Sequence, residues 1–88
     1  MKVQNITGKN ERAILNQFII TDDAGNRFFQ SYKSIIVKID LQGDVTLDKS
    51  TWDYSKTTSR YRNEFLGETT KETEAKIKSG EYVLAELN

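Results

Sequence analysis

Short apolar segments separated by polar turns dominate the first half of the chain. The segment 12–21 is rich in β-branched residues, and a second apolar segment runs over 28–32. Between them, 22–26 contains two Asp residues and a Gly. Asp side chains cap turns, and Gly25 accepts a positive φ without a Cβ clash. These two segments therefore predict a β-hairpin.

A second hairpin is predicted over 35–47. Strict alternation places Ile35, Val37 and Ile39 on one face, and we expect that face to be buried. After a turn at 41–44, Val45 and Leu47 continue the alternation in a return strand. The four segments predict an antiparallel meander. The first ten residues are polar, and we expect them either to fray or to form a short edge strand around Val3 and Ile6.

Helical spacing replaces alternation in the second half. Ser55 is placed to cap a helix over 56–66, and Gly67 is placed to end it in the left-handed conformation. The face that this helix buries is expected to hold Thr58, Tyr61 and Phe65.

A second helix is predicted between Thr69 and Gly80. Thr69 and Glu72 have the spacing of a capping box, in which each side chain bonds the other residue's backbone amide. Two i,i+4 ion pairs are expected, Glu72 with Lys76 and Glu74 with Lys78. The segment 82–87 predicts a final strand that returns to the sheet.

The strands precede the helices along the chain rather than alternating with them. This order, β-β-β-β-α-α-β, predicts an α+β fold in which an antiparallel sheet of four to five strands carries two short helices on one face. The length of 88 residues is typical of one domain, and we expect 1–88 to be a single domain.

Composition narrows the functional classes. The chain contains no histidine and no cysteine, which are the usual general base, the readiest nucleophile and the common zinc ligands. We therefore expect a non-enzymatic binding module with no catalytic residues, no cofactor and no metal. The net charge of zero argues against a dedicated nucleic-acid binder, which usually carries a basic excess.

Hydropathy bears on the location of the protein. No apolar stretch approaches the roughly 20 residues of a membrane span, and the first residues lack the apolar run of a signal peptide. The absence of cysteine fits a reducing compartment. We expect a cytoplasmic protein without a membrane partner.

Residues 49–62, the basic-aromatic segment, stand out from the rest of the chain. They contain the only Trp, two of the four Tyr, and four basic residues against one acid. Three interpretations remain open: Trp52 is a core anchor, the segment contacts a protein, or it contacts nucleic acid.

A partner-binding surface is predicted at this segment. Lys56, Arg60 and Asn63 fall on one side of the predicted helix, away from its buried face. Arg62 lies beside the buried face, and we expect it to bury its stem and expose its charged head. With Tyr54 at the edge, the candidate partner-binding residues are Tyr54, Lys56, Arg60, Arg62 and Asn63.

Acidic residues provide weaker candidates. Asp22 and Asp23 could suggest a metal site, but a hairpin turn explains them better because no spaced calcium loop is present. Asp40, Asp44 and Asp48 could form an acidic patch, for which a solvated edge is the default. A small hydrolase that uses carboxylates is the weakest functional interpretation.

Several stretches resemble a group of small uncharacterised proteins from phages and plasmids of Gram-positive bacteria. They are FQSYKSII at 29–36, WDYSKTT at 52–58, YRNEFLG at 61–67, KETE at 71–74 and IKSGEY at 77–82. The resemblance covers about residues 28–83. It carries no known site residues, and it implies only a context, because small phage proteins often block or redirect host machinery.

The first functional hypothesis is a phage or mobile-element protein that binds and masks or modulates a host protein. The resemblance suggests inhibitors of defence nucleases, of the anti-CRISPR or anti-restriction type, as the example. The alternative is a nucleic-acid-binding accessory protein that uses the basic-aromatic segment. We expect a monomer or a small homo-oligomer.

Overall fold

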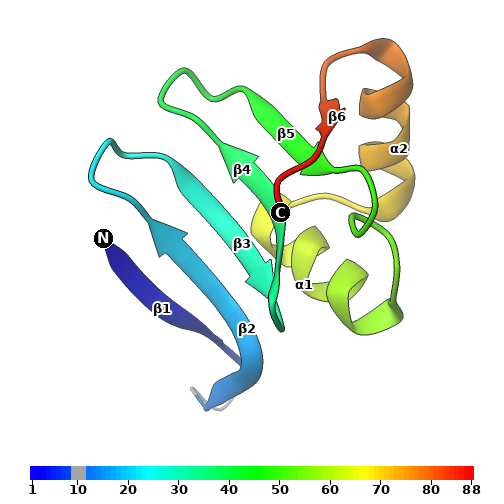
Figure 1. Ribbon diagram of the computed structural model, residues 1–88. Coiled ribbons are helices and arrows are strands. Elements are labelled where there is room, and N and C mark those ends of the chain that lie inside the picture. Colours follow the sequence, from blue (N-terminus) through cyan, green and yellow to red (C-terminus); the bar gives the residue numbers. More distant parts are fainter. Residues whose placement is uncertain (9–11) are drawn as a thin grey trace.

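The computed structural model describes residues 1–8 and 12–88, which form a six-stranded sheet and two helices (Figure 1). The α+β class is confirmed. The strands are β1 (Lys2–Thr7), β2 (Ala13–Thr21), β3 (Arg27–Ser31), β4 (Ser34–Ile39), β5 (Val45–Asp48) and β6 (Val83–Ala85). The helices are α1 (Lys56–Leu66) and α2 (Thr70–Ser79). Within the sheet the strands follow the order of the chain.

Two features of the predicted sheet need correction. The sheet has six strands rather than four to five, because 2–7 form an edge strand that pairs with β2. Of the first ten residues, for which we expected fraying or an edge strand, positions 9 and 10 lie outside the described residues. The sheet is also not wholly antiparallel, because β6 runs parallel to β5. The two helices between these strands form the long connection that a parallel pair requires.

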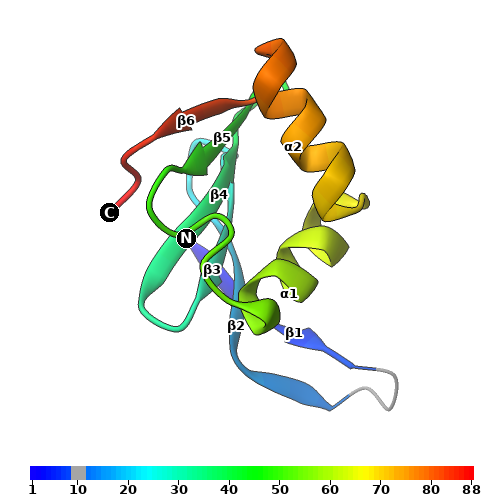
Figure 2. The same cartoon turned by 90° about the vertical axis from the view of Figure 1, so that its right-hand side faces the viewer.

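Both helices lie on one side of the sheet, as expected (Figure 2). Phe29 of β3 points toward them, because its ring stacks on Phe65 of α1 with the centroids 5.9 Å apart. The buried apolar residues are Ile6, Phe29, Ile36, Val37, Leu47, Tyr61 and Tyr82. Trp52 is half-buried and packs against this core, so it contributes to folding from the margin of the core.

The prediction that Ile35, Val37 and Ile39 alone form the buried face of β4 is wrong. Ile36 and Val37 are both fully buried, whereas Ile35 and Ile39 are only partly buried. The cause is a shift in the β3–β4 register between Phe29 and Gln30, which leaves one residue of β4 without an opposite neighbour. Such a bulge interrupts the alternation that a regular strand obeys.

The local signals for helix ends and turns are confirmed. The Ser55 hydroxyl accepts a 3.1 Å bond from the Thr58 amide, and Gly67 ends α1 with φ 71°. Both bonds of the Thr69–Glu72 capping box are present. At the β2–β3 turn, the Asp22 carboxylate accepts bonds from the amides at 24 and 26, which supports the turn interpretation. The hydrogen bond from the Asn26 side chain lowers the pKa of Asp22 further.

Candidate functional site

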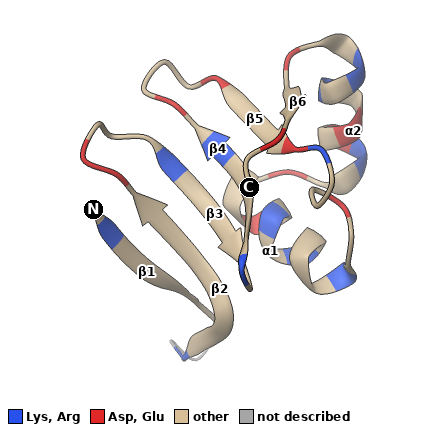
Figure 3. Cartoon of the chain, in the orientation of Figure 1, with Lys and Arg blue, Asp and Glu red and all other residues tan. Residues whose placement is uncertain are grey.

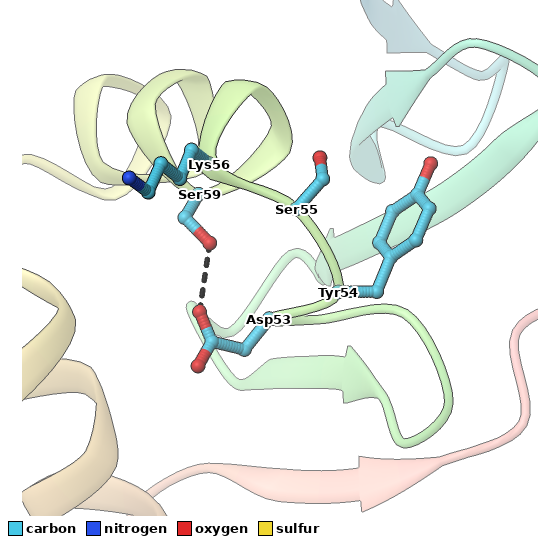
Figure 4. Close-up of a pocket in the computed structure, with 5 residues that line it drawn as sticks. All are labelled: Asp53, Tyr54, Ser55, Lys56 and Ser59. Carbon is cyan, nitrogen blue, oxygen red and sulfur yellow. Dashed lines mark hydrogen bonds between the residues drawn. The ribbon is translucent and has the colours of Figure 1, made fainter.

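A groove of about 330 Å³ opens where the basic-aromatic segment enters α1 (Figure 4). It is lined by Asp53, Tyr54, Ser55, Lys56 and Ser59, and we call it the α1 groove. The loop after β5 supplies the first two residues, and the first turn of α1 supplies the last two. Its position follows from the Ser55 cap, which fixes where the loop ends and the helix begins.

Two exposed members of the predicted partner-binding set, Tyr54 and Lys56, line this groove, and Arg60 follows on the next turn of α1. Tyr54 is 49% exposed, and Lys56 and Arg60 are exposed one helical turn apart. The Arg60 guanidinium lies over the Tyr61 ring, 5.4 Å from its centroid. Figure 4 shows Tyr54 and Lys56 directed away from each other on either side of Ser55, so Tyr54 stands at the edge of this surface. We call Tyr54, Lys56 and Arg60 the Tyr54–Arg60 surface.

Arg62 does not belong to that surface, and the expectation that its head is exposed is wrong. Its side chain is completely buried. The terminal nitrogens of Arg62 donate hydrogen bonds to oxygens of Trp52, Asp53, Ser59, Asn63 and Thr70. The guanidinium also lies over the Trp52 ring, 5.1 Å from its centroid. Arg62 therefore ties the loop, α1 and the start of α2 together.

Asn63 was expected on the exposed face of α1, and this expectation is also wrong. The side chain is half-buried because α2 begins beside it. Its amide nitrogen donates to the Thr70 hydroxyl at 3.2 Å, and its amide oxygen accepts from Arg62 at 2.9 Å. Asn63 thus contributes to the Arg62 network.

Asp53, which lines the α1 groove, compensates the charge of the buried Arg62 guanidinium. Burial lowers the pKa of the Arg62 guanidinium, and the hydrogen bond and charge of Asp53 oppose that shift. The Asp53 carboxylate is 3.3 Å from Arg62 and also accepts a 2.7 Å bond from the Ser59 hydroxyl. Asp53 and Ser59 therefore line the α1 groove and are held in place by hydrogen bonds to each other and to the buried Arg62.

A second polar cluster, which the sequence did not reveal, surrounds Glu68 between the helices. The Glu68 side chain is 4% exposed and accepts from Thr73, Lys76 and Tyr82. Lys76 approaches within 3.0 Å, so the expected Glu72–Lys76 pair is replaced, while Glu74–Lys78 forms at 3.3 Å. Burial favours a higher pKa for Glu68, but these hydrogen bonds outweigh it and lower the pKa.

The default interpretation of Asp40, Asp44 and Asp48 as a solvated edge fails for Asp48, which is buried. Asp40 caps the β4–β5 turn by accepting from the amides of Gln42 and Asp44. Asp48 is 3% exposed and accepts from the Thr51 hydroxyl at 2.6 Å and the Leu87 amide at 2.9 Å. Burial opposes ionisation, but these bonds lower the pKa of Asp48. The carboxylates of Asp40 and Asp48 thus serve the local structure.

The described ranges, 1–8 and 12–88, contain no group of three or more Asp and Glu side chains placed to hold a metal ion. The described helices are too short or too polar to cross a membrane. Figure 3 shows basic positions on α1 and acidic positions at the β2–β3 and β4–β5 turns. The candidate site is therefore the exposed surface at the start of α1.

Comparison with known proteins places the chain in a family. Residues 1–81 match the model of a family of unknown function, DUF8033, and the chain belongs to that family. No curated protein and no solved structure matches the chain. The family description names no activity, so function must be argued from the site itself.

Proposed function

We propose that this DUF8033 protein is a non-enzymatic binding protein of a phage or another mobile element that masks or modulates a host protein. Its contact is the Tyr54–Arg60 surface. An inhibitor of a defence nuclease, of the anti-CRISPR or anti-restriction type, is the specific form that we propose to test first. The resemblance of 28–83 to phage and plasmid proteins supports this context, and the composition supports binding rather than catalysis.

One observation carries the proposal: exposed Tyr and Arg side chains stand on a rigid support. Tyr54 and Arg60 belong to the residue types in which interfaces concentrate their binding energy. The buried Arg62 network fixes the loop and helix beneath them, so little conformational freedom is lost when a partner docks. The α1 groove beside them offers space for one partner side chain.

The alternative of nucleic-acid binding is weakened by the same geometry. Of the four cations in the basic-aromatic segment, Arg62 is buried and Lys49 lies 3.6 Å from Glu86. Lys56 and Arg60 remain for phosphate contacts. Two contacts correspond to a slope of about −2 in a plot of log affinity against log salt, far below that of a typical duplex binder.

Charge reversal tests the proposed surface. We expect Lys56→Glu with Arg60→Glu to preserve the fold, because both side chains are exposed. Capture of partners from host lysate, followed by affinity measurement with the purified partner, should show at least a tenfold loss, about 1.4 kcal/mol. Tyr54→Ala should weaken the same complex.

The matched control is Lys71→Glu with Lys78→Glu, which changes the net charge equally on exposed positions of α2. This variant should retain full affinity. Equal losses in both variants would indicate a general charge effect, and unchanged affinity in the Lys56–Arg60 variant would place the contact elsewhere. A steep salt dependence with nucleic acid as the captured partner would support the alternative function.

A further inference from the structure

Strand β1 leaves one edge of the sheet without a neighbouring strand in the described chain. It lies at the edge farthest from both helices (Figure 1). Five of its six residues are exposed, and Ile6 alone is buried. Natural edge strands are usually protected by charges, prolines, bulges or shortness. The opposite edge strand, β6, has only three residues, whereas β1 has six, with one charge at Lys2, no proline, and a register shift against β2 only at its far end, between Asn5 and Thr7.

An apolar row leads to this edge across the face opposite the helices. Phe29 faces the helices, so its neighbour Phe28 faces the other way. The register places Ile20 beside Phe28, and Val3 of β1 beside Ile20. Val3 ends the row and is 56% exposed. No helix lies over this face in the described chain, as Figure 2 shows.

We propose that two copies of the chain associate by antiparallel pairing of β1 with β1 of the second copy. An edge strand is complementary to itself in this arrangement, because a two-fold axis normal to the sheet brings unpaired amides opposite unpaired carbonyls. The axis keeps both helix-free faces on the same side. In the register that pairs Gln4 with Gln4 of the second copy, the Val3 side chains of the two copies meet diagonally, and the two apolar rows join into one.

Charge favours a second copy as the occupant of this edge. In this register each Lys2 lies opposite Ile6 of the other copy, so the two Lys2 residues stand four positions apart, near opposite ends of the ladder, and the only charges of β1 do not meet. The net charge of zero removes long-range repulsion between copies. A ladder of this length buries less than a standard interface, so we expect dissociation in the micromolar range. The two Tyr54–Arg60 surfaces stay free, which makes the dimer bivalent.

Sedimentation and light scattering between about 5 and 200 µM test the pairing. The wild-type protein should shift from the chain mass of 10.1 kDa toward twice that mass as concentration rises. Val3→Lys should raise the dissociation constant at least about tenfold, because like charges meet across the ladder. Val83→Lys is the matched control. Val83 is the same residue type, is also 56% exposed and lies on the same face, but it belongs to β6.

A charge exchange tests the geometry. At a concentration where the wild-type protein is mainly dimeric, Val3→Lys and Val3→Glu should each be mainly monomeric, and an equal mixture of the two should form a heterodimer. Circular dichroism should show both variants folded, since the side chain that is replaced is exposed. A wild-type protein that stays monomeric at 200 µM, or a mixture that stays monomeric, overturns the proposal. Equal dissociation by Val3→Lys and Val83→Lys also overturns it, in favour of contact through the open face.

Discussion

The guanidinium of Arg62 donates a 2.7 Å hydrogen bond to the hydroxyl of Thr70, the first residue of α2. The two helices are therefore joined at their junction by a buried cation. The residues that α1 buries are Thr58, Tyr61 and Arg62, which are largely polar. The Tyr54–Arg60 surface thus depends on a hydrogen-bond network for its shape, and that network can be tested one residue at a time.

Removing the Arg62 guanidinium should destabilise the protein more than any exposed charge change. Arg62→Met keeps a shorter, unbranched apolar side chain but deletes the guanidinium, and the oxygens bonded by its terminal nitrogens lose their partner. We expect a loss of about 3 kcal/mol in urea unfolding. Arg60→Met, on the exposed side of the same helix, should change stability by less than about 0.5 kcal/mol. Equal effects would contradict the structural role of the network.

Glu68 should make stability fall in acid. Its hydrogen bonds lower its pKa below the ordinary value of 4.5, so the stabilisation is present above that pH. It is lost as the pH falls through the folded-state pKa. Glu68→Gln should cost about 2 kcal/mol at pH 7, because a hydrogen bond to a charged group is lost. It should also flatten the stability profile below pH 4.5. Chemical unfolding at a series of pH values measures both effects.

Tyr82 should make the stability of the protein depend on pH in the alkaline range. Burial, and then the hydrogen bond to Glu68, raise the pKa of its hydroxyl above 10.0. Its stabilisation is complete below that value and is lost as the pH rises through the folded-state pKa. Tyr82→Phe should remove this alkaline dependence and leave the dependence from Asp48 in acid unchanged. An unaltered alkaline limb would show that Tyr82 does not titrate in this way.

Gln17 should be replaceable by an apolar residue with a gain in stability. Its side chain is completely buried, and its amide nitrogen and oxygen have no hydrogen-bond partner among the described residues. Gln17→Met conserves much of the volume and removes the unsatisfied groups, so we expect a gain of about 1 kcal/mol. The control is Gln30→Met, which should destabilise because Gln30 donates to the Tyr32 carbonyl at 2.7 Å. Thermal melting that shows a loss for both would defeat the prediction.

Phe65 anchors α1 on the sheet. Its ring stacks on Phe29, and the Arg27 guanidinium lies 5.2 Å from its centroid on the sheet side. Phe65→Ala should cost about 3 kcal/mol, the lower end for such a truncation, because the ring is only half-buried. Leu15→Ala is the control for an exposed apolar residue, since Leu15 is 81% exposed. A cost below 1 kcal/mol for Phe65→Ala would mean that α1 is held by its polar contacts alone.

At the candidate site, helical spacing correctly predicted the exposure of residues that face only solvent. Lys56 and Arg60 are exposed as predicted, and their role in binding stays a prediction. Spacing failed for Arg62 and Asn63, because the periodicity of one helix says nothing about the loop and the helix that pack against it. Arg62 meets the Trp52 carbonyl ten positions away and the Thr70 hydroxyl eight positions away. No local sequence pattern predicts those two hydrogen bonds.

The sequence by itself determined the helix ends and turns whose hydrogen bonds join residues close together along the chain. Ser55 and Thr69 cap helices through amides three residues away, and Asp22 closes a turn within four. Such interactions involve only residues that are close together in the sequence, so a local pattern can predict them.

Only the tertiary structure decided the features that depend on distant partners. They are the bulge that buries Ile36, the parallel pairing of β6, and the Glu68–Tyr82 bond across fourteen positions. These features form only when segments that are distant in the sequence pack against each other. Their stability depends on the whole fold rather than on any one segment.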